Sequence, residues 1–203
     1  MYARTALTSQ PVGPKERTFT YSNSGYVVAG AMLEAKLDKT WEDLIRAHVF
    51  QPLKLGSAGF GAPGEKGALT QPAGHARLSE KLTAMRVGEG PTDNPYVLGP
   101  AGRVHMSLDD VLAYLGTHRD EAAFLKPESW HALHTPPFGG DYAMGWMVRT
   151  DGNLWHNGSN TLWYAEVQFN RGSGIAAVAA TNDGLAAATQ GVGRTLLRAA
   201  RAV

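Results

Sequence analysis

The sequence predicts an α+β fold, in which a helical region is followed by an antiparallel sheet with a helix at its C-terminal end. Two observations predict it. Apolar residues recur at helical spacing in several segments before residue 139, whereas short apolar runs separated by Asn, Asp and Gly clusters follow it. Connections as short as these join antiparallel neighbours. We therefore divide the chain into a mostly helical and loop region, 1–138, and a sheet with a terminal helix, 139–203.

The composition is that of an ordinary globular protein. Of the 203 residues, 43% are hydrophobic and 18% are charged, which suffices for one domain with a substantial core. The 19 basic and 18 acidic residues nearly cancel, so no nucleic-acid partner and no anionic membrane is indicated. Cysteine is absent, which excludes disulfides and thiolate metal sites. No apolar run is long enough for a membrane span, and no signal peptide is visible, so the chain as it stands is expected in the cytoplasm.

Four helices are predicted in the first region. They are 27–37, a second behind the N-cap Thr40 that ends near Gln51, a third behind the N-cap Ser107, and 127–134. The first 20 residues are predicted to be extended because Pro11, Gly13 and Pro14 interrupt them. Residues 56–100 are rich in glycine, proline and polar side chains, and we predict a long loop there.

Four strands and a closing helix are predicted in the second region. The strands are 142–148, 154–156, 162–169 and 175–180, separated by turns at 150–153, 157–160 and 170–174. The helix, 186–202, has Val192, Leu196 and Ala200 along one side. That side is expected to cover one face of the sheet.

The first candidate functional motif is Tyr21-Ser22-Asn23, just ahead of a small apolar run. Ser22, Asn23 or Ser24 can cap the helix that follows, and Tyr21 and Asn23 then point the same way out of the turn. A phenol and a carboxamide held in fixed register suit a proton relay beside an amide-binding arm. Taken alone, however, the motif is more typical of a half-buried aromatic residue next to an ordinary cap.

The second candidate motif is His156-Asn157-Gly158-Ser159, where one predicted strand ends. A polar or cationic side chain followed by a small polar residue and a glycine makes a strand edge that can pair with an extended substrate. The alternative is a plain hairpin turn, because Asn-Gly is a common turn dipeptide.

Together, the two motifs and the landmarks between them resemble the superfamily of serine β-lactamases, DD-peptidases and class C-like esterases. Tyr21-Ser22-Asn23 matches its Y-x-N motif, and His156-Asn157-Gly158 matches its K-T-G or H-x-G triplet. Three further landmarks in the right order are Pro52-Leu53-Lys54-Leu55, Pro100-Ala101-Gly102 with Ser107 to Asp110, and Tyr142-Ala143-Met144-Gly145-Trp146. The resemblance implies a β-lactamase/transpeptidase-like fold and a serine hydrolase that forms an acyl-enzyme without a cofactor or metal.

The family's nucleophile motif is missing. It is a serine followed three residues later by lysine, and no serine or threonine of this chain has a lysine at that position; Thr83, for example, has Arg86 there. In the family this motif lies many tens of residues before Y-x-N, and only 20 residues precede Tyr21 here. The chain therefore resembles the C-terminal part of a family member, an incomplete domain without the N-terminal strands and the nucleophile helix, and is expected to be inactive alone.

The resemblance also implies roles for the residues that match. The expected catalytic residues are Tyr21 and His156, and the expected substrate-binding residues are Asn23, Asn157, Gly158 and Ser159. Tyr21 would relay protons, and the backbone N–H of Ser159 would supply half of the oxyanion hole. His156 would orient or steer the substrate. Because it is mostly uncharged near neutral pH, unlike the lysine of the K-T-G triplet, the expected substrate shifts from penicillins toward esters or D-amino-acid peptides.

Three interpretations stay open: half of a serine hydrolase that needs its N-terminal part, a non-catalytic relative that still binds acyl or peptidoglycan-like ligands, and a structural remnant. The expected partner of the intact protein is a small acyl substrate or a peptidoglycan-like peptide. A second expected partner is an N-terminal half or another copy of the chain, because the apolar strand 175–180 would otherwise be an uncovered edge. His131 and His134 could share a helix face as metal ligands, but no third ligand is evident and a solvated face explains them, so no metal is expected.

Overall fold

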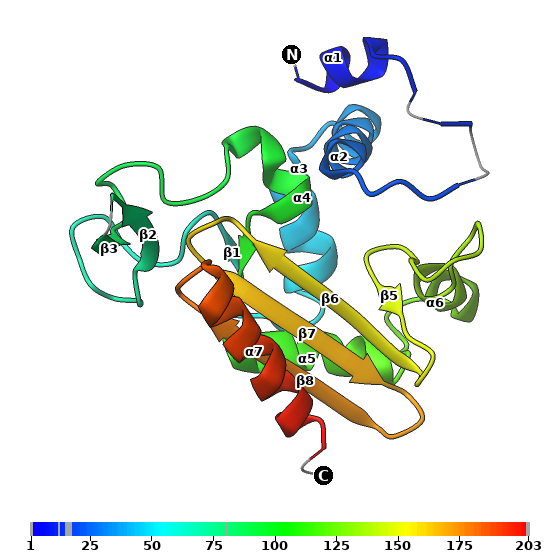
Figure 1. The fold of residues 1–203 in the computed structure, drawn as a ribbon. Coiled ribbons are helices and arrows are strands. Elements are labelled where there is room, and N and C mark those ends of the chain that lie inside the picture. The colour runs from blue at the N-terminus through cyan, green and yellow to red at the C-terminus, as the bar shows by residue number, and fades with distance from the viewer. Residues whose placement is uncertain (1, 12, 15–17, 80, 202–203) are drawn as a thin grey trace.

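The computed structural model describes residues 2–11, 13–14, 18–79 and 81–201. Its centre is a four-stranded antiparallel sheet in the order β5-β6-β7-β8, with α7 on one face and α5 on the other (Figure 1). These elements are β5 (Met147–Val148), β6 (Asn153–Ser159), β7 (Tyr164–Asn170), β8 (Ile175–Thr181), α5 (Leu108–Arg119) and α7 (Ala186–Ala199). The predicted α+β fold, with helices first and a sheet with a terminal helix after them, is confirmed.

Each face of the sheet has its own apolar core. The first core is made by Leu154 and Phe169 of the sheet with Leu115 of α5 and Trp146, and the second by Ala177 and Ala179 with Val192 and Leu196 of α7. Phe169 pairs with Ala176 across β7 and β8, so Ala177 lies on the opposite face. Because helices cover both faces, β8 can be apolar on both sides, which explains its unbroken run of alanine and valine.

The predicted N-caps Ser22, Thr40 and Ser107 are confirmed. Ser22 Oγ accepts from the backbone N of Gly25, so α2 (Asn23–Leu37) begins at the motif and not at residue 27, where its apolar run starts. Thr40 and Ser107 accept from backbone N–H groups in the same way ahead of α3 (Trp41–Ile45) and α5. Beyond α3 the chain continues as a π-helical turn, η1 (Arg46–Phe50). The fourth helix, α6 (Pro127–His134), has proline in its first turn.

The extended conformation predicted for the first 20 residues is wrong for their N-terminal part. The structure has a helix, α1 (Tyr2–Thr8), which packs against α2 (Figure 1). Its C-terminal end is held by side chains that bond back to the helix, since Thr8 Oγ donates to Arg4 O and Ser9 Oγ donates to Thr5 O. The prolines that predicted extended chain lie after this helix.

The long loop predicted for 56–100 contains regular structure. β1 (Gly59–Phe60) pairs with β4 (Val104–His105), and β2 (Gly74–Leu78) forms a hairpin with β3 (Lys81–Met85). A 3₁₀ turn, η2 (Tyr96–Leu98), leads into α4 (Gly99–Gly102). The β2–β3 hairpin projects from the body of the molecule (Figure 1), and among the residues of its two strands only Gly74 is buried, so no row of buried apolar side chains marks these strands.

The predicted strands differ most from the structure at two places. Only Met147–Val148 of 142–148 is a strand, because Gly145, at φ +86°, turns the chain and lets the N–H of Ala143 donate to Trp146 O. The turn predicted at 157–160 is also wrong, since β6 runs through Ser159 in register with β7. The turn follows instead at Asn160, whose Oδ1 accepts from the N–H groups of Leu162 and Trp163.

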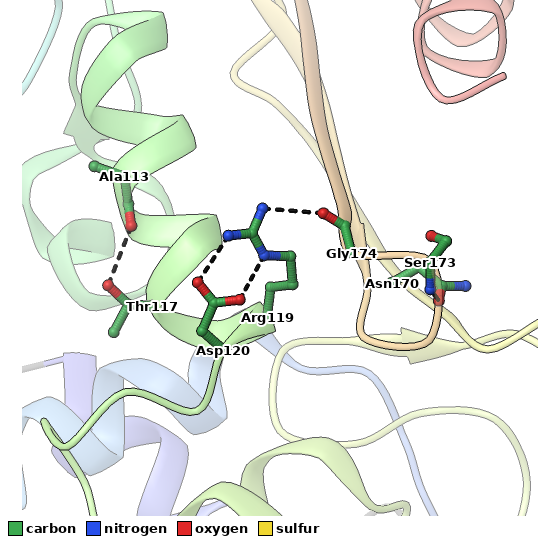
Figure 2. Close-up of polar contacts among 7 residues, drawn as sticks. All are labelled: Ala113, Thr117, Arg119, Asp120, Asn170, Ser173 and Gly174. Carbon is green, nitrogen blue, oxygen red and sulfur yellow. Dashed lines mark hydrogen bonds and ion pairs between the residues drawn. The ribbon is translucent and has the colours of Figure 1, made fainter. Parts of the chain in front are cut away.

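The C-terminal end of α5 is tied to the turn between β7 and β8, as Figure 2 shows. Arg119 Nη1 donates to Gly174 O at 3.0 Å, and the same guanidinium pairs with both carboxylate oxygens of Asp120. Asn170 Oδ1 accepts from the N–H of Ser173 within that turn. Since Asp120 is exposed, the ion pair itself contributes little to stability. The contact to Gly174 fixes α5 along the sheet.

Across these described ranges, none of the helices combines the length and the apolar character needed to cross a bilayer.

Candidate active site

The structure brings Tyr21 and His156 to two sides of a third residue, Tyr142. The Tyr142 hydroxyl lies 2.9 Å from His156 Nε2. The ring of Tyr21 meets the ring of Tyr142 edge-on, with centroids 5.9 Å apart. Tyr142 was not singled out for chemistry by the sequence analysis, and the only signal for it was its place at the start of the landmark that ends at Trp146.

Tyr142 is held rigidly by its surroundings. Its side chain is buried, and its ring stacks on Phe19 with centroids 4.3 Å apart and an interplanar angle of 15°. The turn at Gly145 returns the chain so that Tyr142 forms an isolated antiparallel bridge to Met147. The stacking by Phe19 and the bridge to Met147 together hold the hydroxyl against His156.

Both members of this hydrogen bond are uncharged near neutral pH. Burial lowers the pKa of His156, and a hydrogen bond to the backbone of Asn157 partly opposes that shift. Burial raises the pKa of Tyr142 well above its usual range, and the nearby phenols of Tyr26 and Tyr21 add to the effect. The site is therefore a neutral imidazole paired with a neutral phenol.

The outer edge of β6 is free next to this pair. The N–H of Arg149 donates to Asn153 O across β5 and β6, so every second residue of β6, including Asn157 and Ser159, directs its backbone groups to that same side. Within the described ranges, β5 pairs with β6 only as far as Trp155. Ser159 Oγ donates to Trp163 O, which keeps its hydroxyl in the turn. Its backbone N–H is directed to the free side of β6.

The side chain of Asn157 lies away from this group. It is adjacent to His156 in a strand and therefore points to the opposite face, the one that α7 covers. There Asn157 Nδ2 donates to Tyr164 Oη at 2.9 Å, and Tyr164 donates in turn to Glu166, a buried carboxylate. Only the backbone of Asn157 joins the candidate site.

Asn23 and Gly158 lie at the two remaining predicted positions. Asn23 is exposed in the first turn of α2, two residues after Tyr21. Gly158 is exposed in β6, and no atom lies within 4 Å of the place where a Cβ would be. A ligand could approach the backbone closely at Gly158.

The two histidines considered as metal ligands do not share a site. His131 is exposed and contacts Thr135, whereas His134 Nε2 lies 3.0 Å from Nδ1 of the buried His118. His134 also faces Glu121, which pairs with Arg171. In the part of the chain that the structure describes, no three His, Asp or Glu side chains gather as metal ligands would.

We expect the buried histidine pair to make the fold acid-sensitive. Burial lowers the pKa of His118 to about 3, with His134 contributing, and burial also lowers the pKa of His134. The unfolded chain takes up these protons near pH 6.5 and the folded chain does not, so stability is full above about pH 6.5 and falls as the pH drops toward about 3. Urea unfolding measured across this range should show the loss.

The matched variants for this test are His118→Gln and His131→Gln. Glutamine keeps a hydrogen-bonding side chain but does not titrate, so His118→Gln should flatten the dependence of the unfolding free energy on pH. His131 is exposed, and its replacement should leave that dependence unchanged. An identical slope in both variants would contradict the assignment to the buried pair.

Comparisons with known proteins identify the family of the chain. A family model described as Beta-lactamase matches residues 2–202. Penicillin-binding protein 4 of Amycolatopsis lactamdurans is 25% identical to the chain over an alignment that covers 85% of this chain and 49% of that protein. The chain thus spans about half the length of the curated relative it matches.

Solved structures share the fold at low sequence identity. The octameric penicillin-binding protein homologue from Pyrococcus abyssi superposes with a TM-score of 0.70 at 20% identity, covering 85% of this chain and 40% of that one. The D-stereospecific amidohydrolase from Streptomyces sp. superposes with a TM-score of 0.72 at 21% identity, covering 95% of this chain and 58% of that one. With a family model that matches nearly the whole chain, the conclusion is that this chain belongs to the beta-lactamase family.

Proposed function

We propose that this chain supplies the proton-relay and substrate-strand half of a serine hydrolase site that works through an acyl-enzyme. The observation that carries the proposal is the placement of Tyr21 and His156 around Tyr142, next to the free edge of β6. The nucleophilic serine and its lysine would come from a segment that this sequence does not contain. Residues 1–138 and 139–203 would then be two parts of one incomplete domain, inactive without that segment.

The chemistry assigned to this half is as follows. The serine oxygen attacks the substrate carbonyl, and Tyr21 accepts and returns the proton that the attack and the departure of the leaving group require. The N–H of Ser159 donates to the oxyanion, while Asn23 binds the amide of the acyl group. Water then opens the acyl-enzyme and restores the serine. No cofactor enters these steps.

The neutral state of His156 favours an uncharged acyl donor. A lysine at this place would offer a permanent cation to a substrate carboxylate, whereas the buried imidazole offers only hydrogen bonds. We therefore propose that the acyl donor is an ester, or a D-amino-acid amide or peptide, in preference to a β-lactam. The amidohydrolase named above is D-stereospecific, which supports this order.

A non-catalytic binding protein is the second candidate. The absence of a serine with lysine three residues later favours it, because the chain then keeps a substrate edge but no nucleophile. Such a protein would bind acyl or peptidoglycan-like ligands along β6, and a structural remnant would bind none. Titration with such ligands separates these two.

We also propose that a second polypeptide covers the outer side of β8 and the apolar surface of α2. β8 ends the sheet, and within the described ranges no strand pairs with its outer side. Met32, Leu33 and Leu37 of α2 are exposed. An N-terminal half of the family fold is the first candidate, and another copy of this chain is the second, in line with the octameric homologue.

The test is intact mass after exposure to a fluorophosphonate, with and without a co-expressed N-terminal segment of Penicillin-binding protein 4. We expect no adduct on this chain alone and one adduct on the supplied segment in the complex. A segment whose S-x-x-K serine is replaced by alanine is the control and should take up none. Labelling of this chain alone, or a stable complex that stays unlabelled, would refute the proposal.

A further inference from the structure

We infer that Tyr142 is a positioning residue, whose hydroxyl donates to His156 Nε2 and fixes the imidazole as the tautomer that carries its proton on Nδ1. The short contact between the two side chains is the first observation. The inference deepens the proposed function and rests on it for its catalytic meaning. The tautomer itself is a property of this chain alone.

The packing around Tyr142 fixes the orientation of its ring and so the position of its hydroxyl. Phe19 stacks on one face of the ring and Tyr21 meets it edge-on, while the side chain is only 8% exposed. The ring of His156 lies at 69° to that of Tyr142, with centroids 6.1 Å apart, so the rings touch at their polar edges. A buried phenol needs a hydrogen-bond partner, and His156 supplies it.

The second nitrogen of His156 decides the tautomer. The backbone of Asn157 hydrogen-bonds the ring and raises its pKa, which is the effect of a carbonyl that accepts from a ring N–H. Nε2 already faces Tyr142, so the donating atom is Nδ1. Nε2 must then accept, and the hydroxyl of Tyr142 must donate. Among the described residues, the titratable groups that face this pair are phenols: Tyr142 itself contacts the ring of His156, and Tyr21 and Tyr26 act on Tyr142.

This arrangement links the proton relay to the strand that the substrate is expected to pair with. The Tyr142 hydroxyl bonds Nε2 of His156, and the same ring bonds the backbone of Asn157, which is directed to the free edge of β6. Loss of the hydroxyl frees the ring to take the other tautomer and leaves the backbone of Asn157 without its donor. Tyr142 thus acts through His156 and the strand, without touching the reacting atoms.

The experiment measures the ¹⁵N shifts of the His156 ring in the isolated chain and in two variants. In the wild-type chain, above the pKa of His156, we expect the Nδ1-protonated form to dominate. Tyr142→Phe keeps the ring and removes the hydroxyl, and should move the shifts toward the Nε2-protonated form. Tyr164→Phe is the matched control, because it removes a phenol hydroxyl from the other face of the sheet and should leave the tautomer unchanged.

The outcomes divide as follows. Unchanged ¹⁵N shifts in Tyr142→Phe overturn the inference. A wild-type ring that is protonated on Nε2 also overturns it, and that measurement does not depend on whether a variant folds. In the complemented complex, Tyr142→Phe should lower kcat by about 10-fold to 100-fold with KM nearly unchanged, the loss seen when residues that orient a metal-bound histidine are removed. If the tautomer shifts but the complex never takes up a fluorophosphonate, the proposed function fails and the role of Tyr142 stands.

Discussion

Replacement of Phe169 by alanine is expected to lower the free energy of unfolding by about 3 to 5 kcal/mol, the usual cost of removing a fully buried aromatic ring. Phe169 has no exposed surface, and it lies in β7 at the centre of the core between the sheet and α5. Trp146 meets its ring edge-on with centroids 4.9 Å apart. Its neighbours Leu115 and Leu154 are themselves buried and cannot collapse into the space without moving α5 or β6.

Urea unfolding followed by circular dichroism measures this loss. The control is Phe138→Ala, because Phe138 is 43% exposed and its loss should cost well under half as much. Equal losses in the two variants would show that the core between α5 and the sheet does not dominate stability. The result also bears on the site. Phe169 of β7 pairs with Leu154 of β6, and Leu154 lies two residues before His156 in the same strand.

The features that the sequence predicted correctly are those that depend on neighbours in the chain. Ser22, Thr40 and Ser107 mark helix starts because a cap needs only its own side chain and the next turn of backbone. The antiparallel order of the sheet followed in the same way from short connections. Tyr21 and His156 were found by motif, and the structure places them within reach of a common residue.

The features that the sequence could not show depend on contacts across the fold. Asn157-Gly158 suits a turn locally, but seven consecutive pairs with β7 keep it in a strand. That strand then decides that Asn157 and His156 point to opposite faces, which local composition does not reveal. Tyr142 contacts His156 because of the turn at Gly145 and the packing of Phe19, and neither could be predicted from the sequence.

Replacement of Tyr21 by phenylalanine is expected to lower the acylation rate of the complemented complex by about 10²-fold to 10⁴-fold, the range for loss of a positioned proton-transfer group. The change removes one oxygen and keeps the ring that meets Tyr142 edge-on, so the fold and the Tyr142–His156 bond should persist. Tyr21 is 56% exposed, and its hydroxyl is therefore open to a serine supplied by a second segment. Stability should change little.

The measurement is the single-turnover rate of acylation by an ester substrate, compared across the wild-type complex, Tyr21→Phe and Tyr96→Phe. Tyr96 is 72% exposed and lies outside the candidate site, so its variant controls for the loss of an exposed phenol. A rate in Tyr21→Phe equal to that in Tyr96→Phe would remove Tyr21 from the relay. The double variant with Tyr142→Phe then tests whether proton transfer by Tyr21 and positioning by Tyr142 are coupled: additive losses indicate independent roles, and a loss no larger than the greater single one indicates that both residues act on the same step.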